Sequence, residues 1–200
     1  MSLLLIAVLL LTACAEQVAI EPRLKLAGST TVEPVAAAAA KAFMVTHEGV
    51  EISVRGGGSS IGVLGVTHGA LHIGMASREL KESELEEMPT LTTTVIGRDG
   101  VAVVVNRGVY DGGVTQLTLA QVRDIWLGNI NNWQELGGPD LPILAFDKEM
   151  GRGTRAVFAE IVLGSADAEA PGTIGALGEN EVVLTTVSEN EGAISIVSSG

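Results

Sequence analysis

Three segments of this chain place glycine and a hydroxyl side chain at the start of a helical pattern, directly after a short apolar run. They are Gly-Ser-Thr-Thr at 28–31, Gly-Gly-Gly-Ser-Ser at 56–60 and Gly-Arg-Gly-Thr at 151–154. The first turn of a helix offers free backbone N–H groups and a partial positive charge, which together attract anions. Ser and Thr are also common helix caps, so each segment alone has an ordinary structural explanation. Their repetition predicts a site for a small tetrahedral oxyanion.

Cations accompany the third segment. Lys148, Arg152 and Arg155 lie within the stretch 147–155 and could add positive charge to an anion site. The first two segments use the same arrangement of glycine, hydroxyl and helix start without depending on charge. We therefore interpret Gly153 and Thr154 as the main anion-binding residues of the third segment, and its cations as secondary.

The elements that would position these segments alternate along the chain, which predicts an α/β architecture with mostly parallel strands. In such sheets ligands collect at the carboxyl ends of the strands. Predicted strands cover 24–27, 50–55, 70–76, 92–96, 101–105, 141–146 and 192–198, and predicted helices cover 32–44, 61–68, 81–88, 117–127, 156–163 and 181–188.

Composition limits the function classes. The chain has 200 residues and a net charge of −12, which argues against binding to nucleic acid, where contacts from basic residues to phosphates dominate. Cys14 is the only cysteine, so a disulfide framework and a cysteine-based zinc site are excluded.

The N-terminus resembles an export signal. Residues 1–14 are apolar but too short to span a bilayer comfortably, and they end in Leu-Thr-Ala-Cys, which looks like a bacterial lipobox. We expect 1–14 to be a lipoprotein signal peptide, Cys14 to be lipidated and 15–23 to be a tether, which would place the protein outside the cytoplasm on a lipid anchor. The alternative is a buried N-terminal helix.

Several motifs resemble the phosphate-binding proteins of phosphate ABC transporters. They run in the same order over about 24–198 and include Gly-Ser-Thr-Thr-Val-Glu-Pro at 28–34, Asn-Trp-Gln-Glu-Leu-Gly-Gly-Pro-Asp at 132–140 and Gly-Arg-Gly-Thr-Arg at 151–155. The resemblance implies a type II periplasmic-binding-protein fold, with two α/β lobes closing on a ligand cleft. It also implies a monomer without cofactor or metal, which delivers phosphate to a membrane permease and is not an enzyme.

The resemblance also implies a domain layout. We expect the first lobe at 24–97, the second at 98–192, and the start of a return strand to the first lobe at 193–200. Relatives continue beyond this point, so the C-terminal part is expected to be shortened.

The resemblance assigns site residues as well. Those that match the family's phosphate loops, or replace its charged ligands, are Thr30, Thr31, Ser59, Arg78, Lys148, Arg152, Gly153 and Thr154. Three of them depart from the usual pattern: Lys148 replaces an arginine, Arg152 a serine, and Arg78 stands where many relatives have an aspartate that accepts the proton of phosphate. Without that carboxylate, discrimination between phosphate and sulfate is expected to weaken.

Alternative functions follow from the same residues. The chain could bind another oxyanion such as sulfate, or serve as an anchored sensor or scaffold with the same fold. Residues 58–62 also match the Gly-x-Ser-x-Gly pattern of serine hydrolases, but no histidine follows His72 to complete a triad. His68 and His72 have a spacing that could hold a metal, although surface positions explain them more simply.

Overall fold

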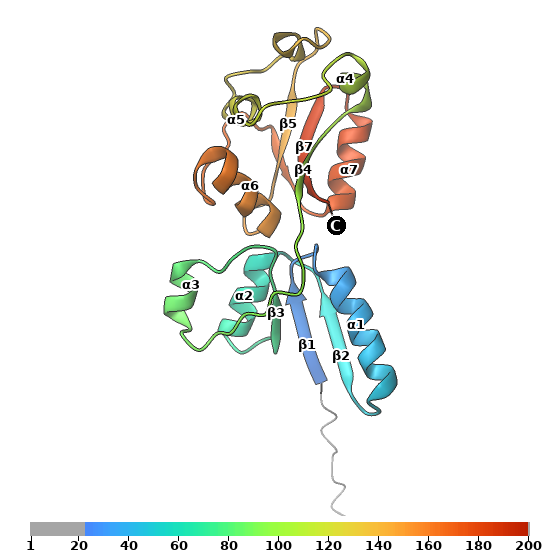
Figure 1. Ribbon diagram of the computed structural model, residues 1–200, viewed down its shortest axis with the longest axis vertical. Coiled ribbons are helices and arrows are strands. Elements are labelled where there is room, and N and C mark those ends of the chain that lie inside the picture. Colours follow the sequence, from blue (N-terminus) through green and yellow to red (C-terminus); the bar gives the residue numbers. More distant parts are fainter. Residues whose placement is uncertain (1–22, 200) are drawn as a thin grey trace, which may run out of the picture.

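Two separate sheets divide the chain into two lobes, arranged one above the other in Figure 1. This description rests on a computed structural model and covers residues 23–199. The first lobe contains β1 (Arg23–Gly28), α1 (Glu33–Thr46), β2 (Glu51–Arg55), α2 (Ser59–Thr67), β3 (Ile73–Met75) and α3 (Glu82–Glu87). Its three strands are parallel in the order β2-β1-β3, so the carboxyl ends of all three lie at one edge.

The second lobe is larger. It contains β4 (Val101–Val105), α4 (Arg107–Asp111), α5 (Leu119–Leu127), the 3-10 helix η1 (Trp133–Leu136), β5 (Leu144–Lys148), α6 (Gly153–Leu163), β6 (Gly175–Leu177), α7 (Asn180–Glu189) and β7 (Ala193–Ser198). Its strands follow the order β4-β7-β5-β6, with β4 antiparallel to β7 and the remaining pairs parallel.

Local sequence accounts for the helices that begin at the sheet edges. Pro34 lies in the first turn of α1, where its missing N–H costs nothing, and the alanines that follow favour a helix. Gly58 precedes α2 with a φ of 102°, a conformation that glycine adopts more readily than other residues. The chain can therefore turn from each strand into its helix within a few residues.

The expectation that 193–200 starts a return strand to the first lobe is wrong. β7 is an inner strand of the second sheet, paired with β4 on one side and β5 on the other. All six of its residues are buried, with Ile194 and Ile196 in one apolar cluster and Ala193 and Val197 in another. A strand that contributes to apolar clusters on both faces is most stable in the middle of a sheet.

The predicted strand at 92–96 is also absent. Residues 91–100 are neither helical nor part of a sheet, and Val95 and Ile96 are exposed. Figure 1 shows this stretch running from the first lobe to β4 in the second. β-Branched residues favour strands only where a neighbouring strand and a packed face are available.

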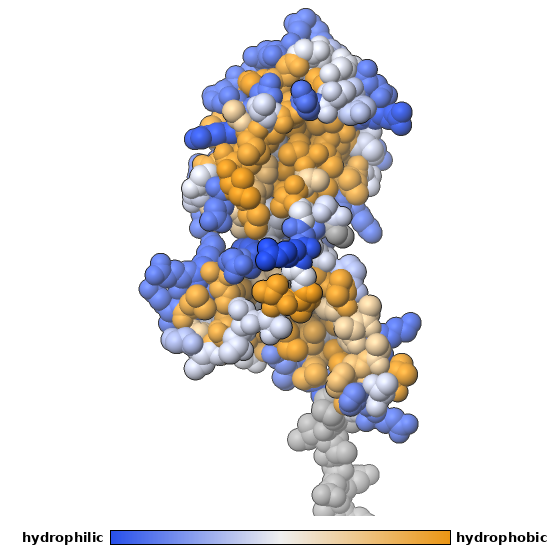
Figure 2. All heavy atoms as spheres, in the orientation of Figure 1, coloured by the Kyte–Doolittle hydropathy of each residue, from blue (hydrophilic) through white to orange (hydrophobic). Residues whose placement is uncertain are grey.

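Apolar packing is concentrated in the second lobe. Trp126 and Trp133 are fully buried there beside Phe158, and a second apolar cluster forms around Val183 of α7. In Figure 2 a hydrophilic band lies at the junction of the two lobes, between apolar surfaces above and below it. Within residues 23–199, no helix combines the length and apolar character needed to cross a bilayer.

Candidate functional site

A small pocket lies where the two lobes meet. Its empty volume is about 200 Å³, including its open side. The residues that line it come from the ends of β1, β3 and β5 and the starts of α2 and α6: Ser29, Thr30, Thr31, Gly58, Ser59, Ser77, Lys148, Arg152, Gly153 and Thr154. Seven of the eight residues predicted for the ligand site are in this group, and Arg78 is not. The three segments that the sequence singled out thus meet at one place.

The first-lobe hydroxyls are held by backbone bonds. Ser29 is buried; its N–H donates to the Met75 carbonyl at 2.8 Å, and its Oγ accepts from the Val32 N–H at 3.4 Å. Among the described residues, the N–H groups of Thr30 and Thr31 have no recorded acceptor. They remain available as donors to a ligand in the pocket.

Ser59 and Ser77 form a second hydroxyl pair. The Ser77 N–H donates to Ser59 Oγ at 3.0 Å, and the two hydroxyl oxygens are 3.4 Å apart. Ser59 is completely buried at the first position of α2. The Ser59 proton can point either to Ser77 Oγ or into the pocket, where an anion would accept it.

The second lobe contributes the start of α6. Gly153 approaches the first lobe so closely that an added Cβ would lie 2.4 Å from the hydroxyl oxygens of both Ser59 and Ser77. Thr154 follows it, is only 6% exposed and lines the pocket, and no hydrogen bond from its hydroxyl is recorded among the described residues. Because no fully buried side-chain donor in residues 23–199 lacks a partner, the Thr154 hydroxyl reaches the open space of the pocket, where it can donate to a ligand.

Lys148 supplies a buried cation at the end of β5. Its ammonium donates to the Gly178 carbonyl at 2.8 Å, and the residue is 3% exposed. Burial and the nearby Arg152 guanidinium lower the pKa of Lys148 to about 8, although Glu179 and Glu149 partly offset this. The ammonium lacks a carboxylate hydrogen-bonded to it in the described structure, so a bound anion would stabilise its charged form.

Arg152 is fixed by two carboxylates of its own lobe. It contacts Glu149 at 2.8 Å and Glu179 at 2.9 Å, and its Nη1 also donates to Thr30 Oγ1 of the first lobe at 3.4 Å. Burial opposes its charge, but the hydrogen bonds to Glu149 and Glu179 outweigh that effect, so the pKa of the guanidinium lies above its ordinary value. Arg152 therefore spans the junction of the lobes as a permanent cation.

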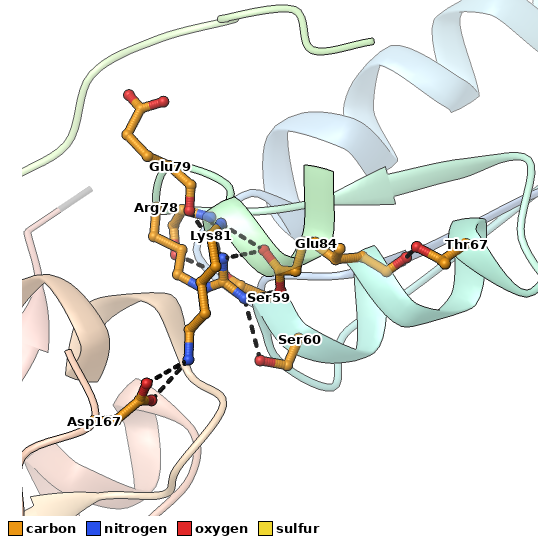
Figure 3. A network of polar contacts seen from close by, with 10 residues as sticks. Ser59, Ser60, Thr67, Arg78, Glu79, Lys81, Glu84 and Asp167 are labelled. Atoms are coloured by element: carbon orange, nitrogen blue, oxygen red, sulfur yellow. Dashed lines mark hydrogen bonds and ion pairs between the residues drawn. The ribbon is translucent and has the colours of Figure 1, made fainter. Parts of the chain in front are cut away.

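Arg78 has other partners. Figure 3 shows its guanidinium between Glu84 and Ser60, with contacts of 2.6 and 2.8 Å to the two Glu84 oxygens and 3.3 Å to Ser60 Oγ. The hydrogen bond from Arg78 holds the pKa of Glu84 below its usual value. Arg78 thus connects α3 to the first turn of α2 and is not part of the pocket lining.

Arg155 also points away from the pocket. Its side chain is buried against Asp147 at 3.1 Å and donates to the carbonyls of Ala166 and Ala168. Asp147 in turn accepts from Trp126 Nε1 and from the backbone N–H of Lys148. Of the three cations in the stretch 147–155, Arg155 stabilises the start of α6 and does not line the pocket.

Direct contacts hold the lobes together around the pocket. The Ser60 N–H donates to the Gly151 carbonyl at 3.0 Å. Lys81 pairs with Asp167 at 2.7 Å across the junction, as Figure 3 shows. Together with the approach of Gly153, these contacts describe a closed arrangement of the two lobes.

Three lining residues were not among the eight predicted for the ligand site: Ser29 and Gly58, which lie within two of the predicted segments, and Ser77, which lies outside them. A usable signal existed for Ser77, because it directly follows the apolar run that forms β3, just as Ser29 follows β1. Hydroxyl residues at the carboxyl ends of parallel strands share one sheet edge, so both could have been grouped with Thr30 and Thr31.

The alternative chemistries gain no support from the geometry. Ser60, the middle residue of the Gly-x-Ser-x-Gly pattern, accepts from Arg78 and has no recorded bond to a histidine. His72 Nδ1 accepts from the Lys25 N–H, and His68 Nδ1 lies 2.9 Å from the Leu64 carbonyl. Residues 23–199 contain no cluster of three or more metal-ligating side chains.

Comparison with known proteins identifies the family to which the chain belongs. A profile of the PBP superfamily domain matches residues 15–200. The chain belongs to the PBP superfamily. The expected type II periplasmic-binding-protein fold, with α/β lobes, is thereby confirmed.

Two solved structures of phosphate-transport proteins are similar to the chain in both sequence and fold. The chain is 36% identical to a Clostridium perfringens protein described as a phosphate ABC transporter substrate-binding protein, solved with bound phosphate; the match covers 88% of this chain and 70% of that one, with a TM-score of 0.76. A phosphate transport receptor from Vibrio cholerae is 31% identical over the same shares, with a TM-score of 0.69.

A curated relative shows how much of a whole protein is covered. The phosphate-binding protein PstS of Bacillus subtilis is 33% identical over 144 residues, which is 72% of this chain and 47% of that protein. The chain thus spans about half the length of this relative. The resemblance to PstS-like phosphate-binding proteins read from the motifs is confirmed.

Proposed function

We propose that this chain captures inorganic phosphate between its two lobes as the solute-binding component of an ABC transporter. The observation that carries the proposal is the pocket itself, in which hydroxyls and helix starts from both lobes converge beside Lys148 and Arg152. The bound phosphate in the Clostridium perfringens relative supports the choice of ligand.

The proposed ligand contacts follow from the hydrogen-bond donors of the pocket lining. Thr30 and Thr31 offer backbone N–H groups and hydroxyls from the first lobe, and Ser59 offers its hydroxyl. Gly153 and Thr154 offer the first N–H groups of α6 from the second lobe. An anion that bonds to both sets holds the lobes together, and its release requires them to separate.

Binding without catalysis fits this lining. Lys148 and Arg152 can stabilise a charge, but no carboxylate or imidazole among the lining residues could act as a general base. The relatives are phosphate-binding proteins rather than enzymes. The site therefore serves capture and delivery, with a membrane permease as the partner.

The proposed location is the outer side of a membrane, through a lipid on Cys14. That residue and the signal-like 1–14 stretch lie outside the described residues, so the lipobox pattern of the sequence supports this part. Cys14→Ala should move the protein from the membrane fraction to the soluble extracytoplasmic fraction. Retention of the variant in membranes would contradict lipidation.

Titration calorimetry of the chain with phosphate near neutral pH tests the binding proposal. We expect a saturable isotherm with one site per chain. The absence of heat with phosphate and with sulfate, from folded protein, would overturn an oxyanion-binding role.

A further inference from the structure

The hydrogen-bonding character of the pocket lining has a consequence for ligand choice. The charged residues in it are the two cations Lys148 and Arg152, and every other lining residue is a serine, a threonine or a glycine. A lining of this kind donates hydrogen bonds readily. It contains no charged acceptor for a proton carried by the ligand.

Three of the hydroxyl oxygens already accept a hydrogen bond from the protein. Ser29 Oγ accepts from the Val32 N–H, Ser59 Oγ from the Ser77 N–H, and Thr30 Oγ1 from Arg152. Each of these hydroxyls keeps one donor and one neutral acceptor lone pair. A protonated ligand oxygen therefore finds only neutral side-chain acceptors in the lining.

The carboxylates of Glu149, Glu179 and Glu84 do not supply the charged acceptor that the lining lacks. Glu149 and Glu179 are bound by the Arg152 guanidinium at 2.8 and 2.9 Å, and neither lines the pocket. Glu84 is held by Arg78 in the same way. Glu33 lies beside Gly56, where an added Cβ would be 2.5 Å from its Oε2, but it does not line the pocket either.

We infer that the site selects tetrahedral oxyanions by charge and not by their proton, so that fully ionised sulfate-class dianions bind about as well as phosphate. The inference rests on the proposed oxyanion-binding function. Monohydrogen phosphate gains no charge-assisted hydrogen bond for its P–OH group, which would otherwise favour it over sulfate. Sulfate satisfies a donor lining with all four of its oxygens.

Competition calorimetry at pH 7.5 tests the inference with sodium phosphate and sodium sulfate as probes. We expect the two dissociation constants to agree within about tenfold, which corresponds to about 1.4 kcal/mol. A preference for phosphate larger than tenfold would overturn the inference and leave the proposed function intact. If neither anion binds, the proposed function itself fails.

A carboxylate introduced into the lining provides a second test. Thr31→Asp places an acceptor at a lining position whose hydroxyl has no recorded partner, and Thr31→Asn is the control of equal size without charge. We expect Thr31→Asp to weaken sulfate binding at least tenfold more than phosphate binding, whereas Thr31→Asn changes both equally. Equal weakening by Thr31→Asp would contradict the inference, and circular dichroism would verify that both variants fold.

The role of Arg152 can be separated from selectivity. Arg152→Ser removes one cation from the lining, and we expect it to weaken phosphate and sulfate by the same factor of about five to ten without abolishing binding. Arg107→Ser is the matched control, because Arg107 is an exposed residue that pairs with Asp111 on the same helix, away from the pocket lining. A change in the ratio of the two affinities with Arg152→Ser would show that selectivity depends on more than charge.

Discussion

The approach of α6 to the first lobe depends on the absence of a side chain at Gly153. At Gly153 a Cβ would lie 2.4 Å from two serine hydroxyl oxygens and 3.0 Å from the Ser77 backbone carbon. The hydroxyls could rotate away, but the backbone could not move without shifting β3 or α6. Glycine at this position is therefore a condition for the lobes to close.

Gly153→Ala should hold the lobes apart and weaken phosphate binding by about five- to 150-fold, since crowding of this kind costs about 1–3 kcal/mol. Gly97→Ala is the control, because an added Cβ there meets nothing within 4 Å. Titration calorimetry of both variants measures the effect. Equal affinities would mean that the pocket binds its ligand without the close approach of Gly153.

The lowered pKa of Lys148 predicts how phosphate affinity depends on pH. Its pKa is lowered to about 8 from an ordinary value of 10.5, so the side chain is a cation at neutral pH and becomes a neutral amine in the ligand-free folded protein above pH 8. The unfolded chain keeps the proton up to about pH 10.5, so the contribution of this residue to stability rises between pH 8 and 10.5. A bound anion favours the ammonium instead. Phosphate affinity should therefore fall above pH 8, with proton uptake on binding at pH 8.5.

Calorimetry in two buffers of different ionisation enthalpy detects that proton uptake. Lys148→Met should remove it, while Lys25→Met, at an exposed position of β1, should leave it unchanged. A constant phosphate affinity between pH 7.5 and 9.5, where the ligand is mainly a dianion, would exclude Lys148 from the site.

At the scale of the elements, a buried ion pair that the sequence did not predict holds the start of α6. The Asp147–Arg155 ion pair is buried, with side-chain exposures of 9% and 3%, and it connects β5 to the first turn of α6. The sequence counted Arg155 as a possible anion ligand because charge and spacing carry no information on direction. Only the packing of Trp126 and the carbonyls of 166 and 168 assigns it to the interior.

Arg155→Met should lower the free energy of unfolding by about 3–5 kcal/mol, because Asp147 would remain buried without its partner. Arg107→Met, which breaks the exposed pair with Asp111, should cost less than about 1 kcal/mol. Urea denaturation compares the two variants. Similar costs would show that the buried pair does not stabilise the start of α6.

Element by element, the sequence predicted the strand–hydroxyl–helix units well, since each depends on neighbouring residues. The sequence-based prediction failed where residues distant in the chain determine strand pairing or side-chain position. The stretch 92–96 has the residues of a strand but no paired strand among the described residues, and β7 was expected in the wrong lobe although its apolar residues fit an inner position. Arg78 was expected at the ligand, but Glu84 holds it beside α2.

For the molecule as a whole, the closed arrangement places both lobes around one small pocket. The Lys81–Asp167 pair crosses the junction, but side-chain exposures of 36% and 64% leave it screened by solvent. The buried contacts at Gly153 and the ligand itself should therefore contribute more to closure than this ion pair does.

Lys81→Ala should change phosphate affinity by less than about threefold at physiological salt, as expected for an exposed ion pair. Calorimetry at low and physiological ionic strength measures the effect. A loss of tenfold or more at physiological salt would assign closure to surface charges rather than to the pocket.

The central claim is that the pocket between the lobes holds an oxyanion on the hydroxyls and helix starts that converge there. Calorimetric titration of Thr154→Val with phosphate tests it most directly, because Thr154 is buried and lines the pocket with a hydroxyl that has no recorded hydrogen bond within residues 23–199. Thr185→Val, at an exposed position of α7, is the control. The predicted result is a phosphate affinity at least tenfold weaker for Thr154→Val and unchanged for Thr185→Val. An unchanged dissociation constant for folded Thr154→Val would contradict the claim.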